Sequence, residues 1–313
     1  MKIITLDEIK KRLIDIDVIV AVEQCFAAFS AGDIVVPPPG ELTFQDPPGD
    51  VHIKYGYDLS SDYYVIKIAS GFYQSDPSCQ GMLLVFTKQS GKAVALLQDE
   101  CYLTNIRTAA AGAIAAKYCA PSVVHRIGIV GCGVQAQLQL AYLRKITACD
   151  QIIVYGLSDE SLANFQQHCP QKITTTLDIA ELAATCNLIV TTTPSHKPLF
   201  DLSMIKPGTH ITAIGSDTPA KQELHVDILQ AADLIVTDSK QQSLSRGEIS
   251  HALAKKVIAP EDVVEIGDII RGKAIGRAND QQITIADFTG IAAQDIAIAE
   301  AVLGQRLVAS STE

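Results

Sequence analysis

The spacing of apolar side chains divides the chain into two parts that meet near residue 121. Upstream, four segments alternate apolar and polar residues with the two-residue period of a half-buried strand. They cover residues 51–55, 64–68, 82–86 and 93–97. We also predict an amphipathic helix at about 6–30, a proline-rich loop at 36–40 and an alanine-rich helix that includes 107–116. The last helix has to end before Pro121, because proline cannot continue it.

Downstream of residue 121, short aliphatic strands alternate with helical segments. The predicted strands are residues 127–130, 152–155, 188–191, 211–214 and 234–237. Because nearly continuous apolar strands are buried on both faces, they predict a parallel sheet covered by helices. The sequence therefore predicts an α/β fold, in which a doubly wound parallel sheet follows an α+β part built on the alternating strands.

The first strand of the second part runs into a glycine motif. Residues 127–130 are followed by Gly131-Cys132-Gly133-Val134-Gln135-Ala136, a G-x-G-x-x-A pattern that opens a predicted helix at 135–146. In a dinucleotide-binding unit, the first glycine allows the tight turn and the second lets the backbone approach a pyrophosphate. The helix N-terminus then faces the phosphates with free N–H groups. The motif predicts a nicotinamide cofactor, and an ordinary glycine turn is the alternative.

The end of the second strand bears on the choice between NAD and NADP. An acidic residue there binds the ribose hydroxyls of NAD, whereas an arginine accepts the extra phosphate of NADP. This chain has Tyr155-Gly156-Leu157-Ser158 instead, with Asp159 one position further on. Both cofactors stay open, and the missing arginine favours NAD slightly.

Composition excludes several classes of protein. Hydrophobic residues make up 48% of the chain and charged residues 19%, so a disordered chain is not expected. The 25 Lys and Arg against 35 Asp and Glu give a net charge of −10, and basic residues cluster only at Lys10-Lys11-Arg12. An acidic chain repels a phosphate backbone, so we expect no nucleic-acid partner.

Neither a membrane span nor a metal site is predicted. No apolar run approaches the roughly 20 residues that a spanning helix needs. The 8 cysteines and 7 histidines lie scattered without the spacing of metal ligands. We therefore expect the cysteines to act as small buried apolar residues in a cytoplasmic protein.

Polar residues follow two later strands of the predicted sheet. Residues 191–195 read Thr-Thr-Thr-Pro-Ser, and the next strand leads into Gly215-Ser216-Asp217-Thr218-Pro219. Open parallel sheets bind ligands beyond the carboxyl ends of their strands. Asp217 is therefore placed either to act as a general acid or base or to cap a helix predicted at 222–231.

Four motifs together resemble the ornithine cyclodeaminase/mu-crystallin family. In chain order they are Arg107-Thr108-Ala109-Ala110, the glycine motif 131–136, residues 215–224 (GSDTPAKQEL) and Asp287-Phe288-Thr289-Gly290. The resemblance implies a substrate-binding and dimerisation domain at 1–120, completed by 291–313, around a Rossmann domain at 121–290. It also implies a homodimer and hydride exchange between a nicotinamide and the α-carbon of a small amino or imino acid.

The same resemblance implies roles for individual residues. Lys67 corresponds to a catalytic or substrate-binding lysine, Arg107 to the arginine that binds the substrate α-carboxylate, and Asp217 to the acid/base aspartate. A guanidinium suits a planar carboxylate because it donates two parallel hydrogen bonds. The residues expected to bind the cofactor are Gly131, Gly133, Val134, Gln135, Gly156, Leu157, Ser158, Thr192, Thr193, Gly215 and Thr289.

This chain departs from the family pattern in its first part. No arginine follows the proline-rich loop, and His52 falls where ornithine cyclodeaminase carries a glutamate suited to a distal ammonium group. Strand alternation places His52 and Lys54 on one face. If that face is the pocket, the pair favours a substrate with a second acidic or polar group, such as iminosuccinate or aspartate. The alternative is that both side chains face solvent on an edge strand.

Three functions are compatible with these observations. The first is an NAD(P)-dependent imine reductase or amino-acid dehydrogenase. The second is ornithine cyclodeaminase itself, which forms proline and ammonia without net turnover of the cofactor. The third is a ligand-binding protein similar to mu-crystallin, against which the presence of Lys67, Arg107 and Asp217 counts.

Overall fold

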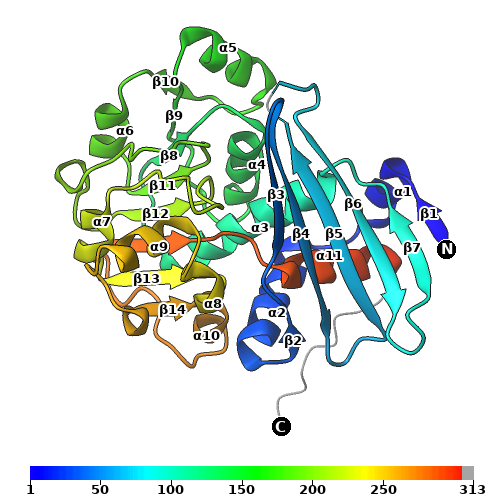
Figure 1. Ribbon diagram of the computed structural model, residues 1–313. Helices are drawn as coiled ribbons and strands as arrows, with labels where there is room; N and C mark the ends of the chain where they lie inside the picture. Colours follow the sequence, from blue (N-terminus) through cyan, green and yellow to red (C-terminus); the bar gives the residue numbers. More distant parts are fainter. Residues whose placement is uncertain (73, 305–313) are drawn as a thin grey trace. The chain divides into compact units, whose positions relative to one another are not determined.

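The computed structural model describes residues 1–72 and 74–304, and it divides into two compact units (Figure 1). Unit 1 comprises Met1–Arg107 and the segment that begins at Ile291, and unit 2 is Thr108–Gly290. The division falls inside a helix, whereas the sequence suggested a boundary near residue 120. The expected domain end at residue 313 lies outside the described residues.

Unit 1 is built on an antiparallel sheet with one parallel edge strand. Its strands are β1 (Lys2–Ile4), β2 (Ile34–Val35), β3 (Gly40–Gln45), β4 (Pro48–Asp58), β5 (Tyr63–Gly71), β6 (Cys79–Thr87) and β7 (Ala93–Leu97). They are ordered β1-β7-β6-β5-β4-β2, with β3 also paired to β4. Its helices are α1 (Leu6–Arg12), α2 (Val18–Ala31), α11 (Ala292–Leu303) and the first turns of α3 (Tyr102–Cys119). Helix α11 packs against β4, β5 and α2, as the red helix of Figure 1 shows.

The N-terminal helix expected at about 6–30 is two helices. Asp17 ends the connection between them, because its carboxylate accepts hydrogen bonds from the backbone N–H groups of Ile19 and Val20 and caps α2. An aspartate at this position favours a helix start over a helix interior. The four strands expected in this part are all present, and β4, β5 and β6 extend further than predicted.

Two cysteines of unit 1 are not the free, buried apolar residues that the sequence predicts. Cys79 at the start of β6 and Cys101 after β7 form a disulfide. The sequence interpretation of every cysteine as a small apolar residue is therefore wrong for this pair, which the antiparallel arrangement of β6 and β7 brings together. Cys25, Cys119 and Cys186 are free and buried, as expected, whereas Cys132, Cys149 and Cys169 are partly exposed.

Unit 2 contains a wholly parallel sheet, as predicted. Its strands are β8 (Ile127–Val130), β9 (Ile152–Tyr155), β10 (Thr174–Thr176), β11 (Leu188–Thr191), β12 (His210–Ala213), β13 (Leu234–Thr237), β14 (Val263–Glu265) and β15 (Thr284–Asp287). Their order is β10-β9-β8-β11-β12-β15-β13-β14. The sequence did not predict β10, β14 or β15, which are short or follow a long irregular segment.

Helices cover this sheet. They are the rest of α3 and α4 (Val134–Leu143), α5 (Asp159–His168), α6 (Ile179–Thr185), α7 (Val226–Ala231), α8 (Lys240–Ser243), α9 (Gly247–Ala254) and α10 (Ile266–Ile270), with two short 3₁₀ turns at Leu202–Met204 and Pro260–Asp262. Helix α4 packs on β8 and β11, α6 on β9 and β10, and α9 on β15. The aliphatic strand residues are buried on both faces, which explains their continuous apolar pattern.

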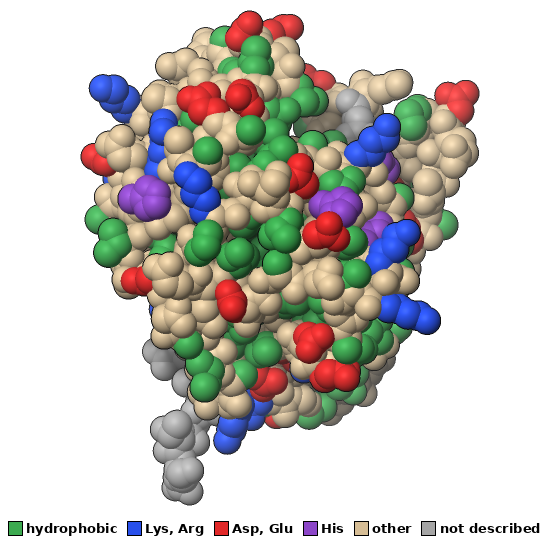
Figure 2. All heavy atoms as spheres, turned by 90° about the vertical axis from the view of Figure 1, so that its left-hand side faces the viewer, with side chains coloured by type: hydrophobic (Ala, Val, Ile, Leu, Met, Phe, Trp, Pro, Cys, Tyr) green, Lys and Arg blue, Asp and Glu red, His purple; other side chains and the backbone are tan. Residues whose placement is uncertain are grey.

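The surface gives no sign of a broad basic region on the face drawn in Figure 2. Among the described residues there, Lys and Arg side chains lie singly between Asp and Glu side chains. Within residues 1–72 and 74–304, no helix is both long and apolar enough to cross a bilayer.

Candidate active site

The glycine motif lies where the strand order of unit 2 changes direction. Strand β8 lies between β9 and β11, and Val130 pairs with Thr191 at their carboxyl ends. Chains that leave neighbouring strands toward opposite sides open a crevice at this point, which is where doubly wound sheets bind ligands. A cavity of about 560 Å³ occupies it in unit 2.

The two glycines of the motif differ in what their surroundings require. Gly131 has φ +113°, and a Cβ atom there would lie 2.7 Å from the Thr192 hydroxyl oxygen, so no other residue fits. Gly133 is the N-cap of α4 with no side-chain cap, and a Cβ atom there would meet nothing within 4 Å. The open space in front of Gly133 is the cradle that a pyrophosphate requires at a helix N-terminus.

Most of the residues expected to bind the cofactor line this cavity. They are Gly131, Gly133, Gly156, Leu157, Ser158, Thr192 and Thr193. Ser158 caps α5 through a reciprocal pair of hydrogen bonds with Ser161, a neighbour that the sequence analysis missed although the spacing of a capping box was visible. The lining also includes Ser195, from the segment 191–195 expected near a ligand, and His196, which was not predicted.

Four expected cofactor residues are not part of that lining. Val134 and Gln135 begin α4. Gly215 follows β12 and lies against the backbone of Thr193, and the Thr289 hydroxyl accepts a hydrogen bond from the Gln242 amide at 2.7 Å.

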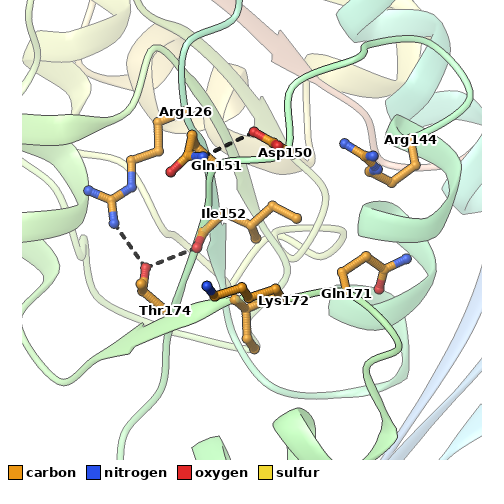
Figure 3. Close-up of a pocket in the computed structure, with 9 residues that line it drawn as sticks. Arg126, Arg144, Asp150, Gln151, Ile152, Gln171, Lys172 and Thr174 are labelled. Carbon is orange, nitrogen blue, oxygen red and sulfur yellow. Dashed lines mark hydrogen bonds between the residues drawn. The ribbon is translucent and has the colours of Figure 1, made fainter.

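A second cavity of unit 2 lies at the opposite, amino ends of β9 and β10 (Figure 3). It measures about 370 Å³ and contains Arg126, Arg144 and Lys172. Arg126 donates to the Thr174 hydroxyl at 2.9 Å, and Arg144 donates to the carbonyl of Cys149 in the loop after α4. Because both guanidinium groups bind within the protein, we attribute them to stability and assign no ligand to this cavity.

Unit 1 contains a buried cluster of charged side chains. Lys54 on β4 and Lys67 on β5 are directly opposite each other in the sheet. Both are buried, and Lys67 is only 2% exposed. Two lysines facing each other across a pair of strands repel, and a buried cation without a partner is costly. The sheet therefore needs a negative charge at this place.

Asp295 of helix α11 supplies that charge. Its carboxylate lies 3.1 Å from the Lys67 amino group and 3.3 Å from Nε of Arg107. The neighbouring Gln294 accepts a hydrogen bond of 2.7 Å from Arg107 Nη1. We refer to Lys54, Lys67, Arg107 and Asp295 as the charged cluster. The sequence analysis missed Asp295 and Gln294, which lie in a mostly apolar helix.

The pKa values in the charged cluster follow from burial and from the neighbouring charges. Burial lowers the pKa of Lys67, and Asp295 opposes this effect. Burial by itself would raise the pKa of Asp295, but the charges of Lys67, Arg107 and Lys54 outweigh it and keep that pKa below its usual value. Burial also raises the pKa of the nearby Asp99 to about 6, so this carboxylate is mostly ionised at neutral pH.

His52 and Lys54 share one face of β4, as the alternation predicts. Strand β4 lies between β5 and the strands β2 and β3, so it is not an edge strand. The alternative of solvent-facing side chains is wrong for Lys54, which is 8% exposed. His52 Nε2 lies 3.5 Å from the Asp50 carboxylate.

Asp217 lies in the loop after β12 of unit 2. Its carboxylate is 37% exposed and forms an ion pair of 2.7 Å with Lys221. The expected helix from residue 222 begins only at Val226, with His225 as its N-cap. Asp217 therefore does not cap it, and Leu224 instead forms a strand-like bridge with Phe200. The general acid or base role stays a prediction.

Comparisons with known proteins agree with this architecture. Residues 2–309 match the ornithine cyclodeaminase/mu-crystallin family. The chain belongs to this family.

Two relatives illustrate the range of activities in the family. Alanine dehydrogenase of Archaeoglobus fulgidus is 35% identical over 306 residues, which cover 96% of this chain and 93% of the relative. Iminosuccinate reductase of Paracoccus denitrificans is 32% identical over 257 residues, which cover 80% and 79%.

Solved structures are similar over nearly the whole fold. An archaeal alanine dehydrogenase dimer with bound NAD superposes with a TM-score of 0.88 at 35% identity, covering 97% of this chain and 95% of that one. The Paracoccus denitrificans iminosuccinate reductase with NAD+ gives a TM-score of 0.87 at 28% identity, with the same coverage. These matches confirm the predicted fold class and support the predicted use of a nicotinamide cofactor.

Gly133→Ala separates cofactor binding from folding. The added methyl group meets no protein atom and φ at this position is −83°, but alanine is a poorer N-cap residue than glycine. We therefore expect the free energy of unfolding to fall by no more than about 1 kcal/mol. The same methyl group would occupy the pyrophosphate cradle. We expect NADH affinity, measured by fluorescence titration, to fall about tenfold or more. Unchanged affinity in a stably folded variant would show that the cradle is not used.

Asp295→Asn tests the charged cluster. Removing one partner of a buried ion pair costs about 3–5 kcal/mol, so the free energy of unfolding should fall by this amount at pH 7. Because the folded-state pKa of Asp295 is lowered, its contribution exists above about pH 4 and disappears as the pH falls through the folded-state value. Urea unfolding measures this effect. The difference in free energy of unfolding between the variant and the unmodified protein should be smaller at pH 3 than at pH 7.

Asp268→Asn is the matched control for this experiment. Asp268 pairs with Arg271 at the surface, 3.4 Å away. Such pairs contribute about 0–1 kcal/mol, so a loss similar to that of Asp295→Asn would contradict the assignment.

Proposed function

We propose that this family member is an NAD(P)-dependent imine reductase or amino-acid dehydrogenase that acts on a small α-amino or α-imino acid. The observation that carries the proposal is the buried charged cluster of unit 1 in a chain whose unit 2 has a dinucleotide cradle. Three cations of the cluster face two carboxylates, Asp295 and Asp99. Buried cations gathered in this way suit the carboxylate of an amino acid as a ligand.

The chain's own residues would divide the work of binding and proton transfer. Arg107 presents a guanidinium held in place by Gln294 and Asp295, and such a fork binds a planar carboxylate. Lys67 is a candidate proton donor to the substrate nitrogen, because burial lowers its pKa toward the range where a lysine exchanges protons. Asp217 is the second candidate acid or base. A dinucleotide cofactor held by Gly131, Gly133 and Ser158 would supply the hydride through its nicotinamide ring.

Helix α5 favours NAD over NADP. Its first turn carries Asp159 and Glu160, directly after the Ser158 cap that lines the cavity. Carboxylates at this place repel an additional phosphate and can accept hydrogen bonds from ribose hydroxyls. The neighbouring structures at 35% and 28% identity hold NAD, which supports the same preference.

In its narrower form, the proposal is that the substrate carries a second acidic group. Lys54 is a candidate cation for such a group, because it is buried on β4 directly opposite Lys67. The identity of 32% with iminosuccinate reductase supports this form, and the identity of 35% with alanine dehydrogenase supports a simple side chain. Ornithine cyclodeaminase remains the second candidate, because a Sinorhizobium fredii relative named an uncharacterised cyclodeaminase is 36% identical over 310 residues. His52 counts against this candidate, since it stands where a glutamate would bind the distal ammonium group.

Two further parts of the sequence prediction stay proposals. The similarity to a solved alanine dehydrogenase dimer supports a homodimer. The cytoplasmic location stays a prediction from the sequence.

Arg107→Lys should lower activity without unfolding the protein. The assay follows oxidation of NADH and of NADPH in the presence of ammonia and each of a panel of 2-oxo acids. Lysine cannot donate two parallel hydrogen bonds, so kcat/KM should fall about tenfold to a hundredfold, chiefly through KM. Arg271→Lys is the control, because Arg271 lies at the surface beside Asp268. Absence of any NAD(P)H oxidation by the unmodified protein, with proline formed from ornithine, would contradict the proposal.

Lys54→Met distinguishes the two substrate classes. If Lys54 binds a second carboxylate, the variant should lose about tenfold in kcat/KM with oxaloacetate and ammonia, because a charged hydrogen bond contributes about 1.5–3 kcal/mol. Activity with pyruvate and ammonia should change little. An equal loss with both substrates would show that Lys54 does not contact the side chain of the substrate.

A further inference from the structure

The carboxyl ends of β11 and β12 are tied together by a buried side chain that belongs to neither strand. Glu223 is fully buried, and each of its carboxylate oxygens accepts two hydrogen bonds. Oε1 accepts from the backbone N–H and the hydroxyl of Thr193, both at 2.7 Å. Oε2 accepts from the Thr191 hydroxyl at 2.7 Å and from the Gly215 N–H at 3.0 Å.

This arrangement requires a carboxylate and not merely a polar side chain. A threonine hydroxyl can turn and become an acceptor, but a backbone N–H can only donate. The N–H of Thr193 faces one oxygen and the N–H of Gly215 faces the other. An amide at position 223 offers one oxygen only, so one of the two N–H groups would face an NH₂ group in a buried place.

Glu223 is itself held by further carboxylates. Its backbone N–H and that of Leu224 donate to the two oxygens of Glu248, at 2.7 and 3.1 Å. At the end of β15, Asp287 accepts from the N–H of Ile249, the residue after Glu248, at 2.8 Å. Burial raises the pKa of Glu223 and of Glu248, and that of Asp287 to about 8. Three buried carboxyl groups in a row are costly, which indicates a purpose other than stability.

The segment that these bonds hold is a wall of the dinucleotide cavity. Thr192, Thr193, Pro194 and Ser195 all line it. The loop after β12 lies tightly against this wall, since a Cβ atom on Gly215 would lie 2.1 Å from the Thr193 carbonyl oxygen. A shift of either loop therefore moves the other, and Glu223 is the group bonded to both.

We propose that Glu223, held in turn by Glu248, is a positioning residue that fixes the wall from Thr192 to Ser195 for the nicotinamide cofactor. The inference rests on the proposed function in one respect, namely that this cavity binds NAD(H). It assigns to Glu223 no contact with the cofactor and no part in proton transfer.

Glu223→Gln tests the proposal, with NADH titrated by fluorescence into the purified full-length protein. We expect Kd for NADH to rise about tenfold, since one buried N–H loses its acceptor. In the steady-state assay, KM for NADH should rise by a similar factor while kcat at saturating NADH changes less than about twofold. A purely structural role would lower the amount of folded protein without producing this split between KM and kcat.

Asp233→Asn is the matched control. The Asp233 carboxylate also accepts one backbone N–H, that of Ile283 at 2.8 Å, but at the amino end of β13. Its replacement should leave Kd for NADH unchanged. If Glu223→Gln does not fold, Thr191→Val serves instead, because it removes one of the four bonds and keeps the shape of a β-branched residue. We expect this variant to raise Kd at least about twofold.

The outcomes separate the two proposals. If the unmodified protein binds NADH and the folded Glu223→Gln or Thr191→Val variant binds it equally well, the positioning role is wrong and the proposed function stands. If the unmodified protein does not bind NADH or NADPH, the proposed function fails and the positioning role fails with it.

Discussion

The ion pairs of Asp295 with Lys67 and Arg107 are the interaction on which unit 1 depends. The strands β4 and β5 and the start of α3 bring three cations into an apolar interior, where each would be strongly unfavourable alone. The compensating carboxylate comes from α11, 228 residues further along the chain than Lys67. This requirement explains why unit 1 is discontinuous in sequence, since its charges are balanced only after the chain has completed unit 2 and returned. Under the proposed function, these buried cations would receive the carboxylate of the substrate.

In unit 2, the buried groups that need a partner are backbone N–H groups. At the carboxyl ends of its parallel strands the chain leaves regular structure, and N–H groups there have lost their partners in the sheet. Glu223, Glu248 and Asp238 accept hydrogen bonds from such N–H groups in buried positions. The same edge of the sheet carries the glycine motif, where the N-terminus of α4 is left open. Most backbone N–H groups named at this edge thus have acceptors within the protein. The N–H groups at the N-terminus of α4 lack a side-chain cap and are available to a ligand.

Much of this architecture follows from local patterns. The strands at 127–130, 152–155, 188–191 and 234–237 have the predicted bounds, because a short aliphatic run between turn residues has few alternatives in a parallel sheet. The glycine motif predicted the cavity for a similar reason, since the conformation of Gly131 is nearly closed to other residues. The family matches confirm the resemblance drawn from four motifs.

The misses have a common cause, which is that they depend on contacts distant in sequence. Asp295 and Gln294 lie in a helix that reads as apolar, and only their partners on other elements give them a role. Glu223 was visible within residues 215–224, but its four donors come from two separate loops. The disulfide of Cys79 and Cys101 likewise depends on strand pairing. The roles of Lys67, Arg107 and Asp217 in the reaction stay predictions, because the two units contribute them separately.

The most direct test of the account is the fate of the hydride. NADH deuterated at one face of C4 would be incubated with the protein, ammonia and the best 2-oxo acid of the panel, and the amino acid product examined by mass spectrometry and NMR. The account predicts one deuterium on the α-carbon from one of the two stereoisomers of labelled NADH and none from the other. Product without deuterium from both stereoisomers would contradict direct transfer between the nicotinamide and the α-carbon.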